Sequence, residues 1–157
     1  MNPTEVFVVH CIVKTLALCH YNLRELVILS PYRSQVAAIK RSLQDMPTLA
    51  SICEVSTIDK YQGRDTDFVI VSTVRSNSSL APGELLRDWR RINVAITRYD
   101  AYLCCYCGLS STRSRCKLII LGSVALFKTL PLLNGLVTLL NDRNWIIELP
   151  QEGFNFS

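Results

Sequence analysis

The sequence predicts an α/β fold, a parallel sheet with helices on both faces. Short runs rich in Val, Ile and Leu alternate along the chain with segments whose apolar residues recur at helical spacing. This alternation is typical of doubly wound parallel sheets, whose ligands lie at the carboxyl ends of the strands. The 157 residues suffice for one domain with one core. We therefore expect any site to lie in the segments that follow the strands.

The first half of the chain contains two predicted helices and three predicted strands. A helix should begin after Thr4, whose hydroxyl can cap it, and run through Leu18. Residues 26–29 form an apolar run that predicts a buried strand. Pro31 suits the first position of the next helix. Two further strands are expected, over residues 52–55 and 67–74.

The second half continues the alternation after a Pro-Gly loop at residues 82–83. A helix over residues 84–98 and a strand over residues 117–122 are separated by residues 99–116. That segment has no amphipathic period and looks inserted. The remaining predicted elements are a helix capped by Ser123, a helix over residues 132–141 and a strand over residues 145–149.

Composition narrows the class of protein. With 49% hydrophobic and 19% charged residues, the chain is more apolar than most free-standing domains. A net charge of +4 is compatible with a polyanionic ligand but is too small to predict one. Seven cysteines without a secretory signal favour a reducing compartment. Charged residues or proline interrupt the long apolar runs, so we expect no membrane span.

Two motifs could carry chemistry. The first is Gln62-Gly63-Arg64-Asp65, where glycine lets the backbone approach a ligand and the polar side chains can bind a ribose or a phosphate-bound water. A surface turn would look the same. The second is Arg98, at the end of an apolar helical stripe, where it could stabilise a transferring phosphoryl group. A solvated basic face is the alternative.

No metal site is expected. Cys104 and Cys107 form a Cys-x-x-Cys with Cys105 between them and Cys116 beyond, but the only histidines lie far away in the sequence. Cys11, Cys19 and Cys53 lie in apolar contexts and are most simply small buried hydrophobes.

Four ordered segments carry a family resemblance: SPYRSQ (residues 30–35), TIDKYQGRD (57–65), VRSN (74–77) and RRINVAITR (90–98). In this order they resemble the second RecA-like lobe of superfamily-one helicases, a P-loop NTPase fold. Within that group the chain looks most like the eukaryotic DNA replication ATP-dependent helicase/nucleases, which process flaps and resect ends. The resemblance covers nearly the whole chain except residues 99–116.

The resemblance implies roles for individual residues. Arg98 would be the arginine finger, and Arg91 would support the same motif. The residues that approach the nucleotide would be Gln62, Gly63 and Asp65. Those that face single-stranded DNA would be Pro31, Tyr32, Thr57 and Lys60.

The chain also departs from the family. It has no Gly-x-x-x-x-Gly-Lys-Ser/Thr loop and no magnesium-binding Asp-Glu pair after a strand. The first lobe, which would hold most of the ATP and magnesium, is missing, as are the nuclease domain and its iron–sulfur cysteines. Tyr99 stands where the family has alanine and opens an insertion that an unspliced intron could encode. We expect residues 1–157 to form one lobe, incomplete at the N-terminus, interrupted at 99–116 and inactive alone.

Two alternatives remain open. An RNA helicase of the nonsense-mediated-decay type has similar motifs, although Lys60-Tyr61 and Asp65 favour the DNA enzyme. A non-catalytic fragment that binds nucleic acid is the other. The expected partners are single-stranded DNA and the first lobe of the same enzyme, and the expected location is the nucleus, with the mitochondrion as the alternative.

Overall fold

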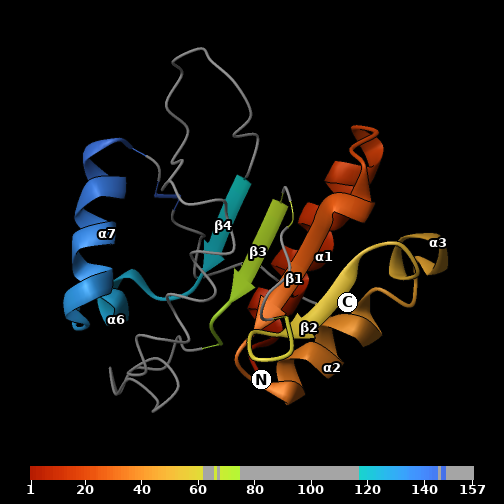
Figure 1. Cartoon of the computed structure of the whole chain (residues 1–157), viewed down its shortest axis with the longest axis horizontal. Coiled ribbons are helices and arrows are strands. Elements are labelled where there is room, and N and C mark those ends of the chain that lie inside the picture. Colours follow the sequence, from red (N-terminus) through yellow and green to blue (C-terminus); the bar gives the residue numbers. More distant parts are fainter. Residues whose placement is uncertain (62–65, 67, 75–116, 145, 148–157) are drawn as a thin grey trace.

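The computed structural model describes residues 1–61, 66, 68–74, 117–144 and 146–147 (Figure 1). They form a parallel sheet with flanking helices, as predicted. The elements in chain order are α1 (Pro3–Leu18), η1 (Leu23–Glu25), β1 (Leu26–Ser30), α2 (Arg33–Ser42), α3 (Pro47–Ala50), β2 (Glu54–Thr57), β3 (Phe68–Ser72), β4 (Lys117–Leu121), α6 (Val124–Lys128) and α7 (Pro131–Asp142).

The sheet has the strand order β2-β1-β3-β4, and all neighbouring strands run parallel. The chain moves outward from β1 to β2 and then crosses back to β3 on the other side of β1. The order of the strands therefore reverses between β1 and β3, and doubly wound sheets bind ligands at the carboxyl side of such a point. The start of the chain lies near this edge of the sheet (Figure 1).

Successive strand residues point to opposite sides of the sheet, so the apolar strands present side chains on both faces. Helices cover both faces. On one face, α1 and α2 bury side chains that include Val9, Val13 and Ile39 against Ile28 and Ile70. The opposite face carries two smaller apolar clusters. One joins β1 and β3 to the turn after β2, and the other packs α6 and α7 against β4; their members include Val27, Val69, Tyr61, Ile120 and Leu133.

The predicted helix start at Thr4 is wrong by two residues. Asn2 is the N-cap of α1, since its side-chain oxygen accepts the amide proton of Glu5 at 3.2 Å. Pro3 occupies the first helical position, where its missing N–H is not needed.

The predicted start of α2 at Pro31 is also wrong. The chain stays extended through Tyr32, with φ −114° and ψ 126°, and the helix begins at Arg33. Proline disfavours the helical conformation in the residue before it, so Ser30 remains in β1.

The second strand lies two residues later than predicted, at Glu54–Thr57. The amides of Ile52 and Cys53 still bond back to the carbonyl of Leu49, so the chain has not yet left the turn after α3. The predictions for residues 84–98 and 99–116 fall outside the described residues. So does most of the predicted strand at 145–149, of which the described residues Ile146 and Ile147 are irregular.

Candidate functional site

The carboxyl ends of all four strands meet at one edge of the sheet, which we call the carboxyl edge. It comprises the residues that end or directly follow β1, β2, β3 and β4: Ser30–Tyr32, Thr57–Lys60, Thr73–Val74 and Gly122. All four residues predicted to face DNA lie there. The fold therefore gathers them from two segments about 25 residues apart in the sequence.

The segment after β1 leads directly into the first turn of α2. Ser30 is fully buried, and its hydroxyl accepts the amide proton of Tyr32 at 3.4 Å. Pro31 and Tyr32 are half-buried, and Arg33 is exposed. No side chain of the described residues caps α2. Its first-turn amides and the Arg33 guanidinium thus give this end of the helix a positive potential, which favours anions.

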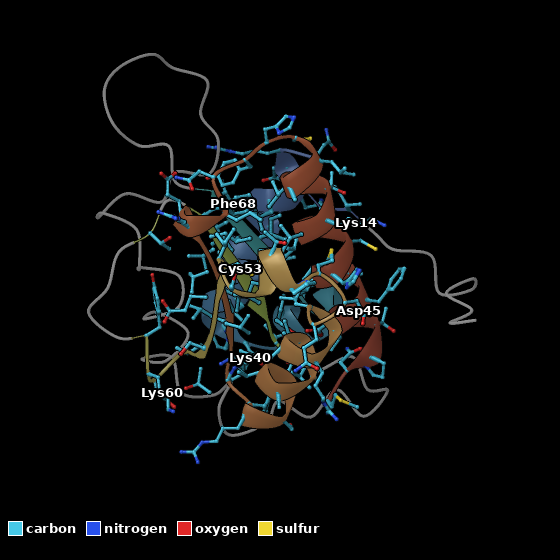
Figure 2. All side chains as sticks on the ribbon, turned by 90° about the vertical axis from the view of Figure 1, so that its right-hand side faces the viewer. Lys14, Lys40, Asp45, Cys53, Lys60 and Phe68 are labelled. Carbon is cyan, nitrogen blue, oxygen red and sulfur yellow. The ribbon has the colours of Figure 1, made fainter. Side chains whose placement is uncertain are left out.

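The segment after β2 brings a lysine to the same edge. Thr57 is the register partner of Ser30, and its carbonyl accepts the amide protons of Lys60 at 3.1 Å and Tyr61 at 3.2 Å. This turn leaves Lys60 exposed and buries the Tyr61 ring against the sheet. In Figure 2, Lys60 lies at the lower end of the molecule, the end to which the strands point in Figure 1.

Thr57 differs from the other three residues predicted to face DNA because it is only 8% exposed. Little of it is free to meet a ligand, so its described environment favours a structural role in the turn. Pro31, Tyr32 and Lys60 are the predicted DNA-facing residues with accessible surface.

Beneath the carboxyl edge lies a set of buried polar side chains that the sequence reasoning missed: Asn2, Glu5, Gln35 and Ser72. Burial raises the pKa of the Glu5 carboxyl above its ordinary value, and hydrogen bonds from Ser72, Val74 and Asn2 oppose that rise. A sequence signal for part of this set existed. An Asn followed three residues later by Glu, before an apolar run, indicates a capped helix start.

The predicted nucleotide-facing residues Gln62, Gly63, Asp65, Arg91 and Arg98 lie outside the described residues. Cys104 and Cys107 do too.

Within the described ranges, no three His, Cys, Asp or Glu side chains are placed to hold a metal ion. Nor is any helix there both long and apolar enough to cross a bilayer.

Comparison with known proteins identifies the family. The model of a family described as an AAA domain matches residues 1–110. The DNA replication ATP-dependent helicase/nuclease DNA2 of Mus musculus is 37% identical over 151 residues, which cover 95% of this chain and 12% of that protein. The human protein of the same name is 43% identical over 123 residues, covering 78% and 10%, and that of Schizosaccharomyces pombe is 33% identical over 148 residues, covering 94% and 9%.

The chain thus spans only 9–12% of the length of these relatives. The similarity confirms the resemblance that the four motifs predicted. The family match extends over more than two thirds of the sequence and includes every predicted site residue, and by it the chain belongs to the AAA domain family.

Proposed function

We propose that this chain is the second RecA-like lobe of an ATP-dependent DNA helicase/nuclease that acts in DNA replication and repair. In this proposal the carboxyl edge binds single-stranded DNA through Pro31, Tyr32 and Lys60. Residues 1–157 form one lobe with an insertion at 99–116. The lobe works in the nucleus, with the mitochondrion as the alternative location.

The observation that supports the proposal best is the convergence of basic and aromatic groups at one edge. Arg33 and Lys60 are exposed there, and the uncapped start of α2 adds its amides. Phosphates are held by such cations and amides, and bases stack on aromatic rings such as that of Tyr32. Relatives named as DNA replication helicase/nucleases match this edge and nearly the whole chain.

ATP would bind in the cleft between this lobe and a first lobe. Gln62, Gly63, Asp65 and Arg91 would approach the nucleotide, and Arg98 would act on the γ-phosphate. Magnesium would arrive with ATP, bound to its phosphates, and be held mainly by the first lobe. The iron–sulfur cluster of the whole enzyme would belong to a different segment.

Lys60→Ala tests the DNA-binding edge in the 157-residue chain. The readout is the affinity for a fluorescent single-stranded oligonucleotide, followed by anisotropy over a range of salt concentrations. Loss of one phosphate contact should weaken binding and reduce the slope of log K against log salt by about 0.7. Lys14→Ala is the matched control, because Lys14 is also exposed but lies on α1 in the upper half of the molecule in Figure 2, away from Lys60.

An equal effect of both substitutions would show that only the net charge matters, which would contradict a DNA-binding edge.

A single-stranded RNA of the same base sequence distinguishes the two helicase classes. The proposal expects DNA to bind at least as tightly as RNA. A clear preference for RNA would favour the nonsense-mediated-decay type instead.

A further inference from the structure

A closed network of hydrogen bonds joins the start of α1, the first turn of α2 and the end of β3. Its four polar side chains are each at most 7% exposed: Asn2, Glu5, Gln35 and Ser72. No buried side-chain nitrogen or oxygen in the described part of the chain lacks a hydrogen-bond partner. Such a network holds its members in one arrangement, since breaking any bond leaves a buried polar group unsatisfied.

Glu5 is the centre of this network. Its Oε2 accepts the Ser72 hydroxyl at 2.5 Å and the Val74 amide at 2.9 Å, and its Oε1 accepts the Asn2 side-chain amide at 3.0 Å. All three groups donate to the carboxylate. The charge of Glu5 is therefore stabilised by three oriented donors, with a smaller attraction from the N-terminal ammonium.

Gln35 connects the network to α2. Its Nε2 donates to the Ser72 hydroxyl at 3.0 Å and to the Asn2 carbonyl at 3.2 Å, and its Oε1 accepts the Asn2 amide proton at 2.8 Å. Its own backbone amide donates to the carbonyl of Tyr32 at 3.1 Å. The position of Tyr32 at the carboxyl edge is thus tied to Glu5 through Gln35 and Ser72.

Val74 is the strained member of this group. Its φ is +72°, in the left-handed region that a β-branched residue rarely adopts. The amide that Glu5 holds belongs to this residue, and its carbonyl lies 3.5 Å from the Asn2 side-chain nitrogen. Strained residues of this kind persist where surrounding contacts determine their conformation, and they cluster at functional sites.

We propose that Glu5 is a positioning residue: by holding the strained Val74 peptide and, through Ser72 and Gln35, the first turn of α2, it fixes the ends of β1 and β3 as one unit at the carboxyl edge. The inference rests on the proposed function in one respect, that this edge binds single-stranded DNA. Glu5 itself is buried and does not touch the DNA. Its effect on binding is to pre-organise Tyr32 and the uncapped start of α2.

Hydrogen exchange on the unmodified chain gives the first test. The Val74 amide should exchange about tenfold or more slowly than an exposed amide, although Val74 lies two residues beyond the end of β3. Glu5→Gln puts an NH₂ group beside either Asn2 Nδ2 or the Ser72 and Val74 donors, and it should reduce that protection, while core amides such as that of Ile28 keep theirs. An unprotected Val74 amide in the unmodified chain would overturn the proposal.

A double-mutant cycle asks whether Glu5 acts on the strain at Val74. Val74→Gly removes the strain, because glycine adopts positive φ without a steric penalty. In the chain that keeps Val74, Glu5→Gln should lower the folding equilibrium constant about tenfold or more. In the Val74→Gly variant, the fold-change that Glu5→Gln causes should be smaller by a factor of about five or more. Equal losses in both backgrounds would show that Glu5 is only a buried polar group.

If Glu5→Gln prevents folding, recovery of a folded chain in the double variant supports the proposal, and failure of the double variant contradicts it.

The functional arm compares oligonucleotide affinity at a temperature where all variants remain folded. Glu5→Gln should weaken binding about tenfold, a loss of pre-organisation. Glu25→Gln is the matched control, because Glu25 also accepts a side-chain amide from an asparagine three residues earlier, Asn22, at 2.7 Å but is only half-buried. Unchanged affinity in Glu5→Gln would refute the positioning role.

If the unmodified chain bound no DNA while exchange and the cycle gave the expected results, the DNA-binding proposal would fail and the structural coupling through Glu5 would stand.

Discussion

Ser30 and Thr57 are register partners at the carboxyl ends of β1 and β2, and the amide of Ile58 donates to the carbonyl of Ser30 at 3.2 Å. This pairing fixes where the chain turns after each strand. It places the exposed Lys60 on the same edge as Tyr32 and the start of α2. The pairing therefore brings two separate sequence motifs into one candidate surface.

Tyr32→Ala should weaken binding of single-stranded DNA by about 5- to 150-fold, the range expected when a stacking aromatic ring is removed. Tyr32→Phe keeps the ring and should bind nearly as well as the unmodified chain. Fluorescence anisotropy at fixed salt measures both affinities. If the two variants lost the same affinity, the hydroxyl would be the important group and stacking would be the wrong explanation.

Gly122→Ala should destabilise the fold. A Cβ at this position would lie 2.3 Å from Thr73 Oγ1 and 2.5 Å from Phe127 Cζ, closer than atoms can approach. Thr73 cannot move freely, because its hydroxyl donates to the carbonyl of Leu121 at 2.9 Å. We expect a loss of about 1–3 kcal/mol in the free energy of unfolding, measured with urea.

Gly135→Ala is the matched control for this substitution. Gly135 lies inside α7, and an added Cβ would meet no atom within 4 Å. Alanine should stabilise this helix by about 0.5–1 kcal/mol, since glycine has more conformational freedom to lose. A stabilising Gly122→Ala would show that the end of β4 is packed less closely than described.

The strands of the core could be predicted from sequence because their burial is nearly complete. All five residues of β1 and all five of β3 are buried, and the first four of each are apolar, so each strand appears in the sequence as a short apolar run. Cys53, predicted to be a buried hydrophobe, is one. Cys19, predicted likewise, is exposed just after the end of α1, because the helix stops there and the following residues turn.

The boundaries and the buried polar network were harder to predict. Ile52 is apolar but 37% exposed, so the apolar pattern placed the predicted start of β2 two residues too early. Glu5 and Ser72 are 67 residues apart, and nothing local to either shows that Ser72 will donate a hydrogen bond to Glu5. Burial of a polar side chain depends on the tertiary contacts that satisfy it, which the hydrophobic pattern does not contain.

Arg98→Ala tests the proposed nucleotide side in an intact two-lobed helicase that carries this lobe. DNA-stimulated ATP turnover should fall by about a thousandfold or more, while DNA affinity should stay nearly the same. The reason is that an arginine finger meets charge chiefly as it develops in the transition state. A loss of DNA affinity with normal turnover at saturating DNA would show that Arg98 contacts DNA and not the nucleotide, and the assignment would be wrong.

The buried carboxyl of Glu5 should make stability depend on pH. Its pKa in the folded chain is raised above the ordinary 4.5, chiefly by burial. Between these two pKa values the folded state binds more protons than the unfolded state. The proton-linked part of the contribution of Glu5 to stability is therefore fully present below pH 4.5 and is lost as the pH rises through the raised pKa.

This prediction is checked by urea unfolding at a series of pH values for the unmodified chain and for Glu5→Gln, which cannot titrate at this position. As the pH falls from neutral toward 4.5, the unmodified chain should become more stable relative to Glu5→Gln, as measured by the free energy of unfolding. A shift of the opposite sign for Glu5→Gln would mean that the hydrogen bonds from Ser72, Val74 and Asn2 outweigh the cost of burying the charge.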